Sequence, residues 1–315
     1  MAIFNYKTGV YPISLETSSC RMVLNQDGSM QLFMGATEIG QGADTVFTQM
    51  AAEVTGITED KVNVLSTQDT DVSPFDTGAY ASRQTYVSGM AVKKTGAIFK
   101  EKILDYAAYM LEKPQDTLDV RDNHIVDKET GTQLLPMEEL ATTAFYSLDR
   151  SVHITAEATS HCKTNTFATG ACFAEVEVDM PLGKVKVTNI VNVHDSGKLI
   201  NPKLAAAQVH GGMSMGLGYG LSEELLFDAK GRPLNDNLLD YKLPTAMDTP
   251  DLNALFVELD DPTGPFGNKA LGEPPAIPVA PAVRNAVLNA TGVAVDSLPM
   301  DPQKMVKHFK EAGLI

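Results

Sequence analysis

The first half of the chain combines short apolar stretches with one strongly periodic helical segment. Residues 21–34, RMVLNQDGSMQLFM, carry two apolar stretches on either side of the pair Asp27-Gly28. Because such a pair tolerates the positive φ of a tight turn, these residues predict a hairpin. From Gln41 onward the spacing becomes helical, and Gly56 is suitably placed to cap that helix. The apolar positions recur every four residues, at Val46, Met50 and Val54.

Two further elements are predicted before the middle of the chain. Residues 85–112 carry a longer helical stripe, and Pro114 follows as its stop. Residues 118–126, LDVRDNHIV, predict another hairpin. Residues 132–165 show no clear period, so we expect them to form a connection between two halves.

The second half repeats the order of hairpin and then helix. Residues 173–187, FAEVEVDMPLGKVKV, alternate strongly about a turn and predict two strands. Residues 201–225 mix helix formers with many glycines, and each glycine costs about 1 kcal/mol relative to alanine in a helix interior. This density indicates a close approach of the backbone to a ligand or another segment, or else tight packing of helix on sheet.

The last part of the chain predicts one strand and two helices. The strand covers residues 252–259 and the first helix covers about 281–291. The final helix is expected to start at Asp301-Pro302, because aspartate is a favoured N-cap and proline suits the first helical position.

Strands that alternate with helices, with few long strands among them, predict an α+β fold. We expect two similar lobes, each a small mixed sheet packed with helices. The expected division is an N-terminal segment over residues 1–20, a first lobe over 21–160 and a second lobe over 161–315.

Composition and charge restrict the partners of this fold. The chain has 315 residues, 43% of them hydrophobic, with a formal charge of −15 and a pI near 4.8. Binding to nucleic acid or to an anionic membrane requires a dense positive surface, so neither is expected. A phosphate, if bound, must be held mainly by backbone amides.

The cysteines and the hydropathy of the chain indicate a cytoplasmic protein. Cys20, Cys162 and Cys172 are far apart and form none of the spacings that zinc or iron–sulfur clusters require. The start has no basic segment leading into an apolar stretch, and no run of about 18 apolar residues occurs. We therefore expect neither export nor membrane insertion.

One carboxylate is placed where it could act as a base. Glu273 lies between Gly272 and Pro274-Pro275, so its side chain is expected at the end of a rigid loop. A general base needs a proton donor within hydrogen-bond reach, and partial burial would raise its pKa. From the residues alone, an exposed loop glutamate is the more frequent case.

Two glycine- and hydroxyl-rich segments precede the predicted helices. Gln41 lies between Gly40 and Gly42 at a junction of loop and helix, where unpaired amides favour an anion or an oxo ligand. A glutamine that bonds the backbone at a helix entry is the alternative. Residues 77–85, TGAYASRQT, have the composition of a phosphate-binding loop, with Arg83 as a source of positive charge. An ordinary helix cap would have the same composition.

Four segments together resemble the second molybdopterin domain of the xanthine dehydrogenase and aldehyde oxidoreductase family. In order they are GATEIGQGADTVFTQ (35–49), DTGAYASRQTYVSG (76–89), NPKLAAAQVHGGMSMGLGYGLSEE (201–224) and GPFGNKALGEPPAIP (264–278). The resemblance covers roughly residues 9–310, nearly the whole chain. It identifies the family more specifically than the substrate.

The resemblance implies a role for each candidate residue. Glu273 would be the base in the hydroxylation of an electron-poor carbon, with water as the source of oxygen. Gln41 would contact an oxo ligand of the molybdenum, and Gln208 would donate to the pterin. Gly40, Gly42 and Ala43 would allow the cofactor to approach closely; its phosphate or dinucleotide tail would lie on Ala81, Ser82, Arg83 and Gln84. The cofactor would be molybdopterin or its cytosine dinucleotide, and its dithiolene, not the protein, would hold the metal.

The resemblance also implies partners. The family subunit is more than twice as long, so the N-terminal half of the molybdenum subunit is expected as a partner, together with an FAD-binding subunit and a 2Fe–2S subunit. Val10 or Tyr11 lies near the position of a phenylalanine that stacks on aromatic substrates in the family. The implied activity is oxidation of a purine such as hypoxanthine or xanthine.

Several alternatives remain open at this point. The chain could come from an aldehyde oxidoreductase or carbon monoxide dehydrogenase relative, since GEPP occurs across all of these. It could also be a truncated fragment that is not catalytic. A generic phosphate- or nucleotide-binding α+β protein comes last, because the chain has no P-loop or GxGxxG fingerprint.

Overall fold

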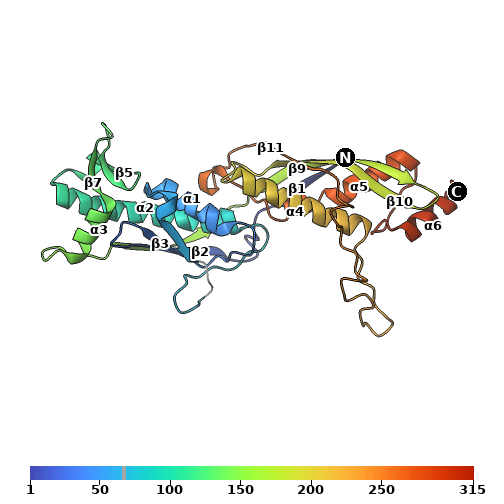
Figure 1. Cartoon of the computed structure of the whole chain (residues 1–315), viewed down its shortest axis with the longest axis horizontal. Helices are drawn as coiled ribbons and strands as arrows, with labels where there is room; N and C mark the ends of the chain where they lie inside the picture. The colour runs from blue at the N-terminus through green and yellow to red at the C-terminus, as the bar shows by residue number, and fades with distance from the viewer. Residues whose placement is uncertain (66–68) are drawn as a thin grey trace. The chain divides into compact units, whose positions relative to one another are not determined.

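The computed structural model describes residues 1–65 and 69–315, and their contacts divide the chain into two compact units (Figure 1). Unit 1 comprises Met1–Lys7, Phe167–Leu259 and Lys269–Ile315, and unit 2 comprises Thr8–Thr166 and Asp260–Asn268. The first strand therefore joins the C-terminal half of the chain, and a short late segment returns to the N-terminal half. The boundaries of these units are not those expected after residues 20 and 160. The division into an N-terminal segment and two lobes stays a prediction.

Unit 2 is built on a four-stranded mixed sheet of order β4-β3-β2-β8. The predicted hairpin is confirmed as β2 (Glu16–Leu24) and β3 (Met30–Met34), which pair antiparallel. The edge strand β4 (Val62–Leu65) runs parallel to β3, and the 3-10 turn η1 (Glu59–Lys61) precedes it.

Two helices pack on this sheet. Helix α1 (Ala43–Thr55) ends where predicted, because Gly56 adopts a left-handed conformation and its N–H donates to the carbonyl of Ala52 over 2.9 Å. Helix α2 (Gln84–Leu111) confirms the predicted longer helix, and its buried positions include Phe99 and Ile103. A second 3-10 turn, η2 (Gln115–Thr117), follows it.

The prediction for residues 132–165 is wrong, because this segment is mostly regular. It contains β7 (Gln133–Pro136), α3 (Met137–Tyr146) and β8 (Thr155–Cys162). β7 pairs with the hairpin of β5 (Leu118–Arg121) and β6 (His124–Asp127), as predicted over 118–126, to form a three-stranded sheet. Helix α3 is only 10 residues long and no described side chain caps its start, and β8 carries no large apolar side chain, so neither element gives a strong signal in the sequence.

Unit 1 is built on a second four-stranded sheet, of order β1-β9-β10-β11. β9 (Phe167–Asp179) and β10 (Lys184–Asp195) form the predicted hairpin and are longer than expected. β1 (Ala2–Lys7) pairs antiparallel with β9, while β11 (Leu252–Phe256) runs parallel to β10.

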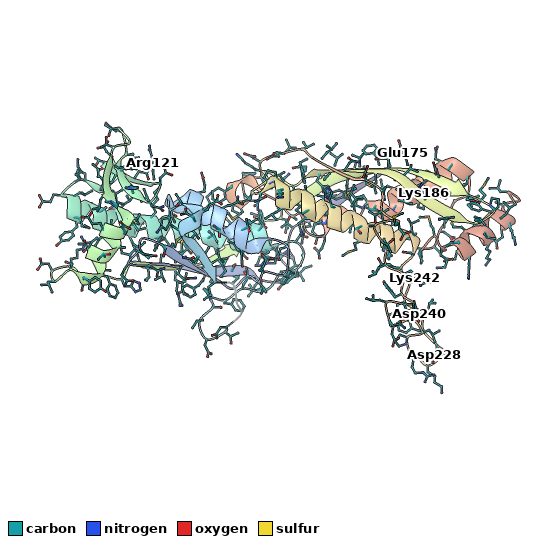
Figure 2. All side chains as sticks on the ribbon, viewed as in Figure 1. Arg121, Glu175, Lys186, Asp228, Asp240 and Lys242 are labelled. Carbon is teal, nitrogen blue, oxygen red and sulfur yellow. The ribbon has the colours of Figure 1, made fainter. Side chains whose placement is uncertain are left out.

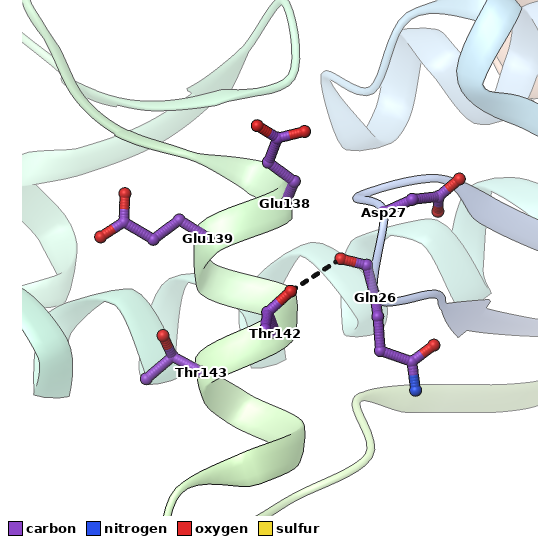
Figure 3. Close-up of a pocket in the computed structure, with 6 residues that line it drawn as sticks. All are labelled: Gln26, Asp27, Glu138, Glu139, Thr142 and Thr143. Carbon is purple, nitrogen blue, oxygen red and sulfur yellow. Dashed lines mark hydrogen bonds between the residues drawn. The ribbon is translucent and has the colours of Figure 1, made fainter.

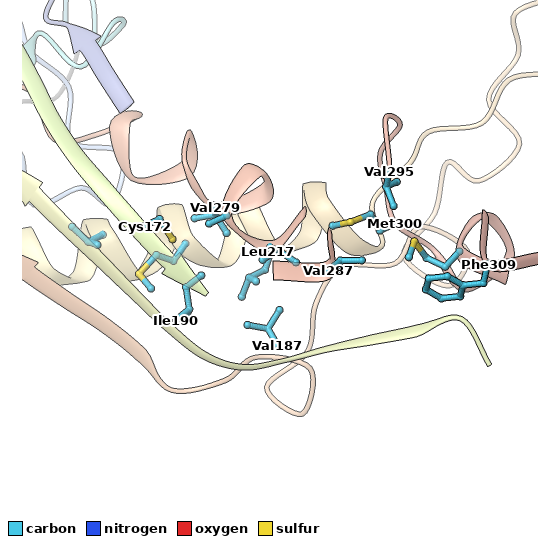
Figure 4. Close-up of a cluster of buried hydrophobic side chains, with 14 residues drawn as sticks. Cys172, Val187, Ile190, Leu217, Val279, Val287, Val295, Met300 and Phe309 are labelled. Carbon is cyan, nitrogen blue, oxygen red and sulfur yellow. The ribbon is translucent and has the colours of Figure 1, made fainter. Parts of the chain in front are cut away.

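Three helices bury the core of unit 1 against this sheet. They are α4 (Pro202–Leu221), α5 (Val279–Thr291) and α6 (Pro302–Glu311). Figure 4 shows that core, in which Ile190 of the sheet, Leu217 of α4 and Phe309 of α6 are all buried. The predicted start of α6 is confirmed, since the Asp301 side chain accepts from the backbone N–H groups of Gln303 and Lys304.

The two four-stranded sheets share one order of elements. In each, an antiparallel hairpin is followed by a helix and then by a strand that lies parallel to the second hairpin strand. The mixed α+β class is thus confirmed, whereas the likeness of two whole lobes stays a prediction. Within residues 1–65 and 69–315, none of the helices has the length and apolar character needed to cross a membrane.

Candidate active site

Glu273 in unit 1 directly precedes a tight 3-10 turn, η4 (Pro274–Ala276), which leads toward α5. Both prolines of the turn are buried, so the backbone of the glutamate is fixed from the C-terminal side. Glu273 is exposed in this chain, the more frequent case for a loop glutamate. The carboxylate accepts a hydrogen bond from the hydroxyl of Tyr6 on β1.

Strand β10 fixes the turn from below. The side-chain amide of Asn192 donates to the carbonyl of Pro275 over 2.9 Å, and Asn192 is fully buried. Just beyond the end of β10, the backbone N–H of Lys269 donates to the carbonyl of Ser196 over 2.8 Å. The Lys269 ammonium also lies 2.6 Å from a carboxylate oxygen of Asp195. The segment from Lys269 to Pro275, which carries Glu273, is therefore bonded at both of its ends to β10 or the residue after it.

The glycines of α4 allow this helix to contact the turn. A Cβ on Gly212 would lie 2.5 Å from the Cβ of Pro275, and a Cβ on Gly216 would lie 2.6 Å from the Cβ of Val279. For these two glycines the close approach is to another segment of the chain. Gln208 is half-buried on the same helix, four residues before Gly212.

Adjacent glycines of α4 offer a matched test of this contact. We expect Gly212→Ala to lower the free energy of unfolding by about 1–3 kcal/mol, because the added methyl group would collide with Pro275. Gly211→Ala should not destabilise the chain, since a Cβ there would meet no described atom within 4 Å and alanine favours a helix. Urea denaturation of both variants measures the difference; equal effects would contradict the close contact.

In unit 2, the structure brings together two predicted cofactor residues that are 43 positions apart in sequence. The side-chain amide of Gln41 donates to the side-chain carbonyl of Gln84 over 2.5 Å and to the backbone carbonyl of Thr37 over 2.9 Å. Gln84 also donates to Thr37, over 2.9 Å. Both amide hydrogens of Gln41 are thus engaged within the protein.

The expectation of unpaired amides around Gln41 is wrong, because Glu38 binds them. Its carboxylate accepts from the backbone N–H groups of Gly40 at 2.7 Å, Gly42 at 3.0 Å and Asp44 at 3.1 Å. Although partial burial pushes the pKa of this carboxyl up, the bonds from Asp44, Gly42 and Gly40 hold the pKa below its usual value. The start of α1 already has its anion. The signal in the sequence for this cap was the position of Glu38, two residues before Gly40.

The loop before α2 has an unusual backbone. Ala81 and Ser82 both adopt left-handed conformations, with φ values of 47° and 51°, which cost energy in residues that carry a Cβ. The carbonyl of Ala81 accepts from the N–H of Gly9 over 2.9 Å. Among the described residues, no side chain caps the start of α2.

Arg83 does not present its charge to solvent, contrary to the expectation that it serves a phosphate. Its buried guanidinium pairs with Glu16 and, at 2.9 Å, with Asp76. It also donates to the carbonyls of Gly78 at 2.6 Å and Thr17 at 2.8 Å. Arg83 therefore joins the loop before α2 to strand β2. Sequence reasoning missed both carboxylates: Glu16 is 67 positions away, and Asp76, although only seven positions away, gave no sign that it turns toward Arg83.

The expected substrate residues lie in the segment before β2. The N–H of Val10 donates to the Glu16 carboxylate over 2.5 Å. Tyr11 lines a cavity of about 610 Å³, whose lining also includes His161, Cys162 and Lys163. This cavity lies wholly within unit 2.

A second cavity of about 380 Å³ lies where the β2–β3 turn meets α3 (Figure 3). It is lined by Gln26, Asp27, Glu138, Glu139, Thr142 and Thr143. None of these described residues was predicted to bind substrate or cofactor. In the part of the chain that the structure describes, no three His, Cys, Asp or Glu side chains gather as metal ligands would.

Comparisons with known proteins agree with this architecture. Residues 1–250 match the molybdopterin cofactor-binding domain. The chain is 48% identical to the xanthine dehydrogenase molybdenum-binding subunit of Escherichia coli O157:H7, a match that covers all of the chain and 42% of that subunit.

Two solved structures are also similar. Quinoline 2-oxidoreductase from Pseudomonas putida 86 gives a TM-score of 0.89 at 25% identity, over 98% of this chain and 42% of that protein. The Cu,Mo-CO dehydrogenase gives a TM-score of 0.87 at 27% identity, over 99% of this chain and 41% of that protein. The chain thus spans less than half the length of these relatives. Because the domain match extends over most of the sequence, the chain belongs to the molybdopterin cofactor-binding domain family.

Proposed function

We propose that this chain is the cofactor-binding part of a molybdenum hydroxylase that oxidises a purine such as hypoxanthine or xanthine. Water would supply the oxygen, and electrons would leave through a 2Fe–2S subunit and an FAD-binding subunit. The observation that carries the proposal is the 48% identity, over the full chain, to a xanthine dehydrogenase molybdenum-binding subunit. The remaining part of such a subunit would complete the site.

The residues of unit 2 fit a pterin cofactor. Gly40 has a φ of 98°, and a Cβ added to it would meet no described atom within 4 Å. The space beside Gly40 is therefore open, and packing within this chain does not explain why it is left open. The side-chain amide of Gln41 donates to the side-chain carbonyl of Gln84, so the two side chains lie next to each other. An oxo group or pterin nitrogen could exchange with that bond without leaving either amide buried and unpaired.

A second feature fits the tail of the cofactor. The strained backbone at Ala81 and Ser82 is held by surrounding structure, a pattern that clusters at ligand sites. The start of α2 has no side-chain cap among the described residues, unlike α1, where Glu38 takes that place. We therefore assign a phosphate of the cofactor to residues 81–84, with Arg83 holding the loop and not the phosphate. Molybdopterin and its cytosine dinucleotide both carry such a phosphate.

Glu273 is the proposed base. A carboxylate on a fixed turn accepts a proton well because little reorganisation is needed to reach it. Tyr6 would hold one carboxylate oxygen and so fix the orientation of the base. When bound, the molybdenum cofactor would supply the redox centre that takes two electrons from the substrate. Gln208, half-buried on α4, would donate to the pterin.

The cavity at Tyr11 supports a ring-shaped substrate. Its volume of about 610 Å³ is typical of small-molecule sites, and Tyr11 supplies an aromatic wall next to Val10. The similarity to a CO dehydrogenase favours a second candidate function, the oxidation of a much smaller molecule such as carbon monoxide. Turnover of hypoxanthine, xanthine, an aldehyde and carbon monoxide by the assembled enzyme would distinguish these activities.

Cofactor retention tests the assignment of Gln41. We expect Gln41→Ala to weaken cofactor binding roughly 10-fold or more, because partners around a bound metal group typically contribute that much. The measurement is the ratio of molybdenum to protein in the purified, assembled subunit. Gln31→Ala is the control, since Gln31 bonds a backbone carbonyl on the neighbouring strand β4. An unchanged ratio for Gln41→Ala would refute the assignment.

A further inference from the structure

Residues 222–251 link α4 to β11 and form what we call the arm. Figure 1 shows the arm extending away from the sheet and helices of its own unit. Many of its apolar side chains are exposed. They are Leu225, Leu226, Phe227, Leu234, Leu238, Leu239, Leu243 and Met247.

Hydrogen bonds give the arm a defined conformation. At its base, the Ser222 hydroxyl donates to the carbonyl of Lys242 over 2.8 Å, and the Tyr241 hydroxyl donates to the Glu223 carboxylate over 2.8 Å. Near its middle, the N–H of Leu234 donates to the carbonyl of Leu226 over 2.8 Å.

Polar side chains extend this frame to the tip. Asn235 accepts from the N–H of Leu226 over 2.8 Å and donates to the carbonyl of Glu224 over 2.7 Å. At the tip, Arg232 pairs with Asp228 over 2.7 Å. The frame is thus made mainly of polar groups, and it does not use the leucine side chains.

The apolar side chains consequently point outward from a preformed scaffold. Leu238 and Leu239 are each 79% exposed and Met247 is 93% exposed. Figure 2 shows Asp228, Asp240 and Lys242 spread along the arm, so charged residues of both signs lie between the apolar ones. Single exposed leucines are common in soluble proteins, but a cluster on one ordered element marks an interaction surface.

We propose that the arm docks onto the remaining polypeptide of the molybdenum-binding subunit. This proposal rests on the proposed function, and it commits to one partner. The E. coli subunit and the two similar enzymes each continue for more than half their length beyond the part that this chain matches. Obligate protein interfaces are more hydrophobic than transient ones. An apolar surface that is exposed in the isolated chain therefore fits an obligate partner. A polypeptide that belongs to the same subunit meets that need better than a transient one.

Hydrogen exchange in the complete molybdenum-binding subunit tests the docking. Amides of residues 222–251 should exchange at least 10-fold more slowly in that subunit than in this chain alone, before any flavin or iron–sulfur subunit is added. The double variant Leu238→Asp, Leu239→Asp should remove most of this protection. Leu148→Asp in unit 2 is the control and should leave the protection unchanged, because Leu148 is a fully exposed leucine outside the arm. Thermal unfolding of the isolated chain should be the same for all variants, since these side chains have no core to leave.

Three outcomes would overturn the proposal. The first is that the arm exchanges equally fast in the complete subunit. The second is that its protection requires the flavin or iron–sulfur subunit. The third is that its protection increases with the concentration of the isolated chain, which would indicate docking onto a second copy. Molybdenum content is measured on the same samples, and turnover is measured after the flavin and iron–sulfur subunits have been added to them. A subunit that holds molybdenum and turns over with an unprotected arm would refute the docking alone, whereas failure of both would refute the proposed function.

Discussion

Replacement of Glu273 by glutamine is expected to lower turnover of the assembled enzyme by about 100-fold to 10,000-fold, the usual contribution of a general base. Glutamine has nearly the same shape, and its side-chain oxygen can still accept the bond from Tyr6. The buried turn Pro274–Ala276 should therefore keep its conformation. Only the ability to take a proton is lost.

The measurement is the steady-state rate together with the molybdenum content of the same preparation. Glu175→Gln is the matched control, because Glu175 is an exposed glutamate on β9 of the same unit (Figure 2). We expect it to retain both the rate and the metal. A Glu273→Gln enzyme with near-normal turnover would remove this residue from the mechanism, while loss of molybdenum would indicate a structural role instead.

Local signals account for most of what the sequence predicts correctly. The turn at Asp27-Gly28, the cap at Gly56 and the start of α6 at Asp301 each depend on neighbours within a few residues. Helix α3 escaped prediction although its buried residues recur at helical spacing, because it is only 10 residues long and no described side chain caps its start. Helix α6 is equally short, and its Asp301 cap separated the two cases.

The partners of the candidate residues could not be predicted in the same way. Tyr6 and Glu273 are 267 positions apart, and their contact depends on β1 joining the sheet of unit 1. Gln41 and Gln84 meet only because the starts of α1 and α2 lie next to each other. Residue types and motifs indicated which side chains matter, but their bonding depends on long-range topology.

Arg83 illustrates the same limit with the largest consequence for stability. From the sequence it looks like a charge for a phosphate, yet the fold places it between Glu16 and Asp76 with every partner inside the protein. Its neighbours Ala81 and Ser82 hold strained conformations, and Arg83 bonds the carbonyl of Gly78 in the same loop. Its proposed effect on the cofactor is therefore through the shape of the loop before α2.

Replacement of Arg83 by methionine should lower the free energy of unfolding by about 3–5 kcal/mol, because it leaves two carboxylates buried without a positive partner. Their side chains are only 2% and 1% exposed. Urea denaturation of the chain measures the loss. The control is Arg21→Met, whose pair with Glu157 is 38% and 51% exposed and should be worth no more than about 1 kcal/mol. Equal costs for the two variants would mean that solvent or another donor satisfies Glu16 and Asp76, and the loop before α2 would then need a different support.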